Sequence, residues 1–488
     1  MQRSSGVLLH ITSLPGRFGI GTLGKEAYDF IDLLKAGGQS HWQVLPLNPT
    51  GFANSPYQGV SAFAGNPYLI SLESLVEIGL LKKEDLPKVK FKSNNKVDYE
   101  FQSNVKGKIL KKAYENFKLK DTAFLGFKEK EAFWLEDYAL FMAVKEYFSL
   151  NPFWKWEKDI ANKEKSASSK YLKKLSDEVE FYKFEQYIFF IQWRDVKNYA
   201  NKNGIKIIGD LPFYVARDSV DYWANRELFD KSGRMSGCPP DTFCKNGQLW
   251  ENPIYDFDTM ALDGFKWWVM RFTKAKSMYD LIRIDHFRGF EAFYAVESNM
   301  KDAVKGKWIK GPSYTLFDKI MNQVGKLPVI AEDLGNITKE VHELLGHYGY
   351  PGTKVLQFAF DKSKNSMYLP YNYKNNCVVY TGTHDNNTAI GWFVSLDDFD
   401  KKFFIEYTGD CEVNDVSKVL IRLAYSSVAD LAIIPVQDIL KLPGDARMNT
   451  PGTIKGNWEF KLEKGQFSKK HADELLLLAE TYGRIIKN

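Results

Sequence analysis

The chain has 488 residues, of which 44% are hydrophobic and 26% are charged, and its formal net charge is +5. This length suits one large barrel domain with insertions, or two to three ordinary domains. The charge is small for the length, and Lys and Glu are interleaved, which argues against a nucleic-acid-binding protein with a concentrated basic face. No stretch approaches the roughly 18 consecutive apolar residues of a membrane-spanning helix, so no membrane association is expected.

Short apolar runs that end in polar or charged residues predict eight strands. Near-continuous apolar runs are typical of parallel strands buried on both faces. Helical patterns follow most of the runs, as at Lys25–Ala36 and Ile337–Leu345. Eight such units favour an α/β protein with a (β/α)8 TIM barrel over an open sheet. The predicted strands are Gly6–Ile11, His41–Leu47, Ile205–Phe213, Leu281–Phe287, Pro328–Leu334, Thr353–Phe360, Cys377–Asp385 and Leu431–Leu440.

Two connections between predicted strands are long enough to hold insertions into a single catalytic barrel that spans residues 1–488. Residues 75–204, between the second and third strands, are Lys-rich and predict a large, mainly helical insertion subdomain. Residues 214–280 predict a further insertion at the C-terminal rim. Within it, Ser236–Tyr255 is irregular and rich in Gly, Pro, Asn and aromatic residues. Long rim loops on barrels are usually functional, so we expect this loop to cover a substrate.

Charged residues stand at or just past the ends of several predicted strands. Barrel enzymes build their active sites at this C-terminal rim. A carboxylate there can also cap the next helix, an interpretation that suits Asp333. Helix capping explains four such strand ends less well than an active site does. The residues are Asp210, Arg283, Asp285, His286, Glu332, Asp333, His384 and Asp385.

The usual cofactor and metal motifs are missing from the sequence. The seven histidines form no HxxxH or HExxH pattern, and there is no GxxxxGK[ST] loop or Gly-x-Ser-x-Gly elbow. Gly19, Gly21 and Gly24 match GxGxxG but follow a Pro-Gly turn, so the match is a coincidence or a loop on the substrate side. We therefore expect neither cofactor nor metal.

Cysteine usage and the N-terminal region predict a cytoplasmic protein. The apolar run near the N-terminus is too short for a signal peptide. The cysteines contain no CxxC pair and are typical of reduced thiols in a large chain. They are Cys238, Cys244, Cys377 and Cys411.

Two carboxylates have surroundings that suit glycosidic bond cleavage, which commonly needs one protonated and one ionised carboxyl group. Residues 283 and 285 lie on the same face of a strand, so Arg283 can hold Asp285 ionised as a nucleophile. A structural ion pair explains that pair equally well. Glu332 follows the apolar segment Val329–Ala331, which favours a raised pKa and a role as general acid.

Ten motifs in order resemble the 4-α-glucanotransferases known as amylomaltases or disproportionating enzymes, which form glycoside hydrolase family 77 of the α-amylase clan. They cover nearly the whole chain except residues 75 to 200, and their order makes the resemblance specific. The motifs are SGVLLHITSLPG (5–16), HWQVLPLNPTG (41–51), SPYQGVSAFAGNPYLI (55–70), GDLPFYVARDSVDYWAN (209–225), GQLWENPIY (247–255), YDLIRIDHFRGFEAFY (279–294), IAEDLG (330–335), PGTKVLQFAF (351–360), YTGTHDNNT (380–388) and ARMNTPG (446–452).

The resemblance implies transfer of α-1,4-glucan segments between glucans, maltooligosaccharides and glucose, with no obligatory protein partner. It implies Asp285 as nucleophile, Glu332 as acid/base and Asp385 as a third carboxylate that grips the sugar hydroxyls. Tyr57 and Trp250 are alternatively loop anchors, and His286 alternatively bonds to backbone near the nucleophile. The implied substrate-binding residues are Ser55, Tyr57, Asp210, Trp250, Arg283, His286, His384 and Asn449.

Two other functions fit parts of the pattern. An α-amylase-type hydrolase would use the same scaffold and the same covalent intermediate, with water as acceptor. A non-catalytic glucan-binding protein would keep the barrel, but binding alone needs no acid/base pair. The complete set of Asp285, Glu332 and Asp385 therefore argues against a binding protein.

Overall fold

The computed structural model describes residues 1–89, 91, 93–240, 245–361 and 365–486. Eight strands form one sheet in the order β10-β11-β12-β1-β2-β3-β6-β9, and every neighbouring pair is parallel. Each lies within or overlaps one of the eight predicted runs, so the barrel prediction is confirmed. The strands are β1 (Ser4–Leu8), β2 (His41–Gln43), β3 (Lys206–Leu211), β6 (Leu281–Ile284), β9 (Val329–Ala331), β10 (Gly352–Val355), β11 (Cys377–Tyr380) and β12 (Leu431–Pro435).

Side-chain and backbone hydrogen bonds join β9 to β10 and close the barrel. The Ala331 N–H donates to the Pro351 carbonyl at 2.9 Å, and the Thr353 hydroxyl donates to the Ala331 carbonyl at 2.9 Å. The Thr353 N–H donates to Asp333 Oδ1 at 2.6 Å. The interpretation of Asp333 as a helix cap is therefore wrong, because the next helix, α13 (Lys339–Tyr348), begins only after Thr338.

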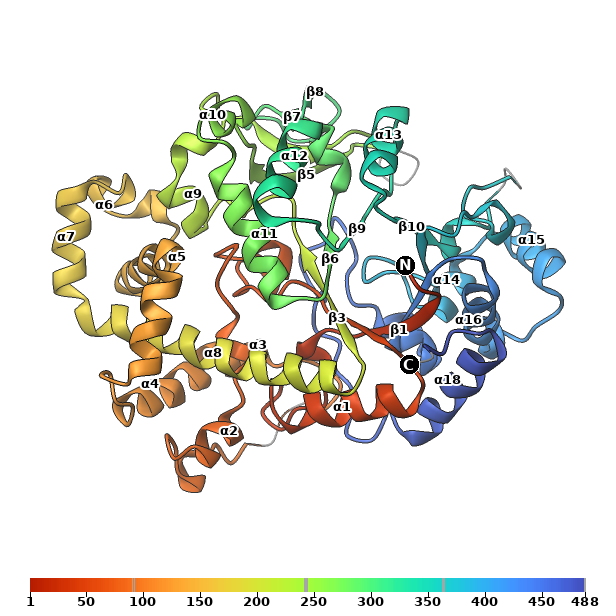
Figure 1. The fold of residues 1–488 in the computed structure, drawn as a ribbon, viewed down its shortest axis with the longest axis horizontal. Helices are drawn as coiled ribbons and strands as arrows, with labels where there is room; N and C mark the ends of the chain where they lie inside the picture. Colours follow the sequence, from red (N-terminus) through yellow and green to blue (C-terminus); the bar gives the residue numbers. More distant parts are fainter. Residues whose placement is uncertain (90, 92, 241–244, 362–364, 487–488) are drawn as a thin grey trace.

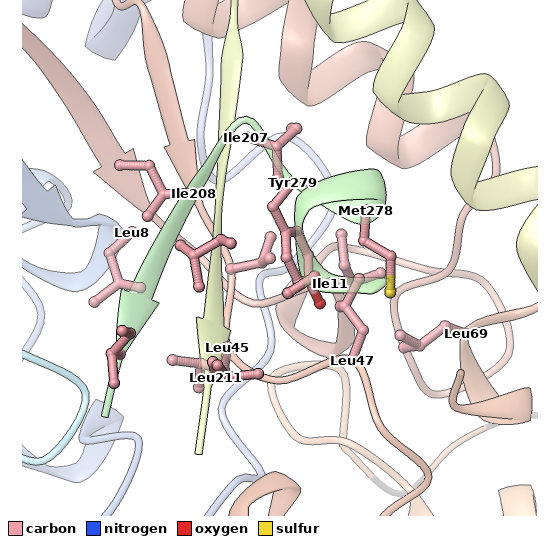
Figure 2. Packing of buried hydrophobic residues seen from close by; sticks show 14 of the residues in the cluster. Leu8, Ile11, Leu45, Leu47, Leu69, Ile207, Ile208, Leu211, Met278 and Tyr279 are labelled. Atoms are coloured by element: carbon pink, nitrogen blue, oxygen red, sulfur yellow. The ribbon is translucent and has the colours of Figure 1, made fainter. Parts of the chain in front are cut away.

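The barrel core is built from the strands and the residues that follow them. Figure 2 shows Leu45, Leu211 and Tyr279 among the buried residues of this core. A Cβ at Gly209 would lie 2.2 Å from the Tyr279 ring, so only glycine lets β3 pass this side chain. The close approach places the next residue, Asp210, at the C-terminal end of the barrel.

The predicted strands extend too far at their C-terminal ends. The last run, Leu431–Leu440, contains β12 and then the short helix α17 (Val436–Ile439). Its residues stay buried across this change. A buried apolar run does not distinguish strand from helix by periodicity alone, which explains the error.

Helices surround the sheet and fill the connections (Figure 1). The segment between β2 and β3 is mainly helical, and its long helices pack against each other. Residues 356–361 and 365–376, between β10 and β11, hold only 3-10 turns. The other helices are α1 (Lys25–Ala36), α2 (Leu72–Glu77), α3 (Tyr99–Phe101), α4 (Gly107–Glu115), α5 (Thr122–Tyr147), α6 (Lys158–Ala161), α7 (Lys165–Lys174), α8 (Ser176–Lys202), α9 (Val220–Ala224), α10 (Phe257–Leu262), α11 (Lys266–Met278), α12 (Ser313–Val324), α14 (Ala389–Ser395), α15 (Asp398–Thr408), α16 (Val416–Ser426) and α18 (Lys469–Thr481).

A buried ion pair fastens the helical segment to the barrel. Lys274 of α11 lies 2.7 Å from Glu131 of α5, and both side chains are less than 10% exposed. The Trp134 indole also donates to Glu131, at 2.6 Å. The Lys274 ammonium stands 3.7 Å above the centre of the Phe190 ring. Together these contacts join α5, α8 and α11.

A second, antiparallel sheet lies at the rim, in the order β5-β4-β7-β8. Its strands are β4 (Met235–Cys238), β5 (Gln248–Pro253), β7 (Ala292–Val296) and β8 (Gly306–Lys310). The prediction that Ser236–Tyr255 is irregular is therefore wrong, because β4 pairs with both β5 and the distant β7.

Two further findings concern the cysteines and the helices. Cys377 and Cys411 are free thiols, Cys238 is half-buried at the end of β4, and Cys244 lies outside the described residues. No helix among the described residues is long and apolar enough to cross a membrane.

Candidate active site

A buried arginine joins two carboxylates at the ends of β3 and β6. Arg283 Nη1 lies 2.8 and 2.7 Å from the two oxygens of Asp210 and 3.1 Å from Asp285 Oδ1. Arg283 and Asp210 are buried, whereas the Asp285 side chain is 26% exposed. The predicted placement of Arg283 beside Asp285 is confirmed. Asp285 is thus the member of this group that solvent can reach.

Tyr57 links this group to the end of β11. Its hydroxyl donates to Asp210 Oδ2 at 2.7 Å, and its ring stacks on His384 with centroids 5.2 Å apart and planes 9° apart. Ser55 caps the 3-10 turn that carries Tyr57, because its hydroxyl oxygen accepts the Tyr57 N–H at 3.2 Å. The predicted residues Ser55 and His384 therefore both contact Tyr57.

Asp385 is oriented by a segment near the C-terminal end of the chain. The Asn449 amide donates to Asp385 Oδ1 at 2.6 Å, and the Asn449 N–H donates to the His384 carbonyl at 3.1 Å. Arg447 donates to the carbonyl oxygens of Asp385 and Asn449. The Asp385 side chain remains 44% exposed, so it is held in place and open to a ligand.

Backbone N–H groups hold the Glu332 carboxylate. Its two oxygens accept from His286 at 2.8 Å and from Leu334 at 2.9 Å. Its own N–H donates to the Ile284 carbonyl, and its carbonyl accepts the Phe287 N–H. Glu332 therefore continues the pairing of β9 with β6 past the strand ends, beside Asp285.

Burial raises the pKa of both Asp285 and Glu332, and it is the largest cause for each. Arg283 opposes the shift in both cases, and the carboxylates of Asp210 and Asp385 add to the rise at Asp285. Glu332 is also opposed by its two backbone hydrogen bonds. Several carboxyl groups thus share one nearby guanidinium, which favours a proton on the Asp285–Glu332 pair.

Aromatic rings form one wall of the site around His286. The edge of Trp250, on β5, meets the His286 ring with centroids 5.0 Å apart, and the Tyr214 ring lies 6.1 Å away. Burial lowers the pKa of His286 to about 4, so the imidazole is neutral near pH 7. Its Nε2 has no hydrogen-bond partner among the described residues, and its backbone φ is +48°. The alternative of a side-chain bond to backbone finds no support there.

Trp458 belongs to this site, although no motif in the sequence singles it out. Its ring lies 5.7 Å from that of Tyr57 and 6.0 Å from that of His384. Its φ is +65°, a conformation that a bulky residue adopts at a cost of about 1–3 kcal/mol. Such strain persists only where the surroundings hold the backbone in place.

A strand-like contact with residues 95–99 holds the segment around Trp458. The Val97 N–H donates to the Glu459 carbonyl at 2.7 Å, and the Tyr99 hydroxyl donates to the Trp458 carbonyl at 2.9 Å. Lys96 and Glu459 form an ion pair at 3.0 Å. We call this contact the 95–99 clamp. A local motif could not have revealed it, because the two segments lie more than 350 positions apart.

All eleven residues predicted for the site take part in the contacts described above. Within the described part of the chain, no three His, Cys, Asp or Glu side chains are arranged to hold a metal ion. The site therefore offers paired carboxyl groups, a cation and aromatic faces, which together suit acid/base and nucleophilic chemistry on a sugar.

Comparison with known proteins agrees with this chemistry. A family model described as 4-alpha-glucanotransferase matches residues 9–467. The 4-alpha-glucanotransferase of Clostridium butyricum is 46% identical over 485 residues, covering 98% of this chain and 100% of the relative. That of Thermus thermophilus is 45% identical over 504 residues, covering 99% and 100%.

A solved structure has the same fold over the same length. The amylomaltase from Streptococcus agalactiae in complex with acarbose superposes with a TM-score of 0.95 at 39% identity, covering 99% of this chain and 100% of that one. Family model, full-length relatives and structure all agree. The chain belongs to the 4-α-glucanotransferases of glycoside hydrolase family 77.

Proposed function

We propose that this 4-α-glucanotransferase moves α-1,4-glucan segments to the 4-hydroxyl of glucose or of another glucan by a retaining double displacement. The observation that carries the mechanism is the pair Asp285 and Glu332, both with raised pKa, beside the single guanidinium of Arg283. A retaining enzyme needs one proton and one negative charge on two nearby carboxyl groups.

In the first step, Glu332 donates its proton to the bridging oxygen while an Asp285 oxygen attacks the anomeric carbon. The bond from that carbon to the bridging oxygen breaks, and the reducing-end fragment leaves with the proton. In the second step, ionised Glu332 takes the proton of the incoming 4-hydroxyl as that oxygen attacks the anomeric carbon. The bond to Asp285 breaks, and two inversions give net retention.

The proton is assigned to Glu332 because only Asp285 contacts a cation directly. Arg283 lies 3.1 Å from Asp285 Oδ1, and the 26% exposure of this side chain lets water stabilise its charge. Two effects oppose the assignment: burial raises the pKa of Asp285 strongly, and two backbone N–H groups stabilise ionised Glu332. The direct contact with the guanidinium supports ionised Asp285 as the nucleophile.

The remaining predicted residues suit binding of the sugar. Asp385, held by Asn449 and open to solvent, is placed to accept bonds from sugar hydroxyls. Trp250 and Tyr57 present ring faces of the kind that pack on a pyranose. Ser55, Asp210, Arg283, His286 and His384 position these groups through the contacts described above.

Whether sugar or water accepts the glucosyl group depends on how well the site is covered. We assign this cover to the β4–β5 hairpin, within residues 236–255, and to residues 446–452. A shortened 236–255 segment is expected to raise the ratio of hydrolysis to transfer. An unchanged ratio would contradict this role. The free thiols at Cys377 and Cys411 are in keeping with a cytoplasmic protein.

Incubation with maltotriose tests the function. The wild-type protein is expected to give glucose and a ladder of longer maltooligosaccharides at a constant number of reducing ends. Asp285→Asn is expected to abolish both products, while Asp473→Asn on exposed α18 retains them. Reducing ends that rise without a ladder would identify a hydrolase. No turnover by the wild type would revive the binding-protein interpretation.

A further inference from the structure

A half-exposed tryptophan lies against an arginine with free donors, outside the site described above. Trp154 is 44% exposed, and the guanidinium carbon of Arg217 stands 4.8 Å from the centre of its ring. Arg217 is itself exposed, and among the described residues it has no hydrogen-bond or ion-pair partner. The surface here therefore offers an apolar ring next to unused N–H donors.

The frame under this pair is rigid. The neighbour of Trp154, Phe153, is buried, and its N–H donates to Asp218 Oδ1 at 3.2 Å. Asp218 Oδ2 forms an ion pair with Lys145 of α5 at 2.5 Å. Trp154 thus directly follows the anchored residue Phe153, and Arg217 directly precedes the anchored residue Asp218. A fixed geometry lowers the entropy lost when a ligand binds.

The pair also lies close to the cleavage site along the chain. Arg217 belongs to the loop that follows β3 and is three residues beyond Tyr214, whose ring lies 6.1 Å from that of His286. Three peptide units span at most about 11 Å. A glucan chain that leaves the cleavage site along this loop would come within reach of Trp154 and Arg217.

We infer that Trp154 and Arg217 form an accessory binding site for an α-1,4-glucan chain. The apolar face of a glucose unit packs against the indole, and the guanidinium donates to the sugar hydroxyls. The inference rests on the proposed function, because a glucan substrate supplies the chain that reaches the pair. Only a long substrate spans both places, so the site adds affinity for long chains and none for short ones.

Trp308 provides a matched control. It is 39% exposed and also lies under a cation, the guanidinium of Arg288 at 3.8 Å. Arg288 is buried and donates to the Asn336 carbonyl, so its donors face the protein and not a ligand. Loss of Trp308 removes an equally exposed indole without removing the proposed combination of ring and free donors.

The test compares Trp154→Ala, Arg217→Gln and Trp308→Ala on maltotriose and on long-chain amylose. Trp154→Ala and Arg217→Gln are expected to raise the KM for amylose about three- to tenfold, with kcat and the KM for maltotriose unchanged. Trp308→Ala is expected to match the wild type on both. In an Asp285→Asn background, the first two substitutions are expected to reduce retardation in amylose-containing native gels, and Trp308→Ala is expected to leave it unchanged.

Two results would overturn the accessory site, and a third would refute the proposed function. Wild-type amylose KM and gel retardation in Trp154→Ala would overturn the accessory site. Equal losses on maltotriose and amylose, or a lowered Tm with them, would also overturn it, because they indicate a structural role. Failure of the wild type to disproportionate maltotriose would instead refute the proposed function, and gel retardation of the wild type would still test the binding site.

Discussion

Replacement of Arg283 by methionine removes the only cation among the described residues that is in direct contact with Asp210 and Asp285. Arg283 is 4% exposed and Asp210 is fully buried, so water does not replace the lost partner. Loss of one member of a buried ion pair typically costs about 3–5 kcal/mol, because the other charge stays buried. At 488 residues, the entropy of unfolding is about 1 kcal/mol per kelvin, so Tm should fall by about 3–5 °C near pH 7.

The fall in Tm caused by Arg283→Met should depend on pH. Burial already raises the pKa of Asp285, and removal of Arg283 raises it further. A carboxyl group whose pKa is raised in the folded state contributes stability that is present at low pH and is lost as the pH rises through that pKa. The Tm difference from wild type should therefore be largest at neutral and alkaline pH and should shrink as the pH falls.

Scanning calorimetry at one scan rate across this pH range measures the effect. Arg194→Met is the matched control, because Arg194 pairs with Asp195 at 3.0 Å while 63% exposed, and such pairs contribute about 0–1 kcal/mol. A Tm deficit for Arg283→Met no larger than that of Arg194→Met would refute the reasoning. A large deficit that does not change with pH would show that lost packing, and not unpaired charge, is responsible.

Three further results are expected. Asn449→Ala removes the 2.6 Å bond to Asp385 and should lower kcat/KM for maltotriose about tenfold with Tm unchanged. Wild-type values of KM and kcat in this variant would contradict the role of Asn449. Lys274→Met leaves buried Glu131 unpaired and should destabilise by about 3–5 kcal/mol in calorimetry without changing KM. Because the pKa of Glu332 is raised, kcat/KM should stay high at pH values above the usual glutamate pKa. It should fall once the pH exceeds the raised pKa of Glu332, since the proton donor is then lost. An alkaline limb in a pH–rate profile at about 4.3, the pKa of free glutamate, would exclude this assignment.

The barrel could be predicted because its signal is local. Each of the eight strands is a short apolar run, and the polar residues after it mark the C-terminal rim. Asp210, Asp285 and Glu332 could therefore be assigned to one rim before their contacts were known. The predicted ends of the runs were less accurate, since Leu431–Leu440 remains apolar and buried where β12 gives way to α17.

The rest depends on contacts between distant segments. The composition of residues 236–255 predicts an irregular loop. The strands found there depend in part on the pairing of β4 with β7, which starts more than 50 residues later and leaves no local signal. Asp333 has the position of a helix cap, but its bond to Thr353 depends on how β10 approaches β9. The place of Trp458 beside Tyr57 has no local signature. Such partners follow from the closed barrel and not from spacing along the chain.

The 95–99 clamp has a consequence for how the protein is made. It joins Tyr99 to Trp458, two residues 359 positions apart, and the Trp458 ring packs at a tilt beside the rings of Tyr57 and His384. During synthesis, the ribosome has finished more than nine-tenths of the 488 residues before this contact can form. The nascent chain therefore stays without a finished active site until Trp458 has left the ribosome and can reach Tyr99.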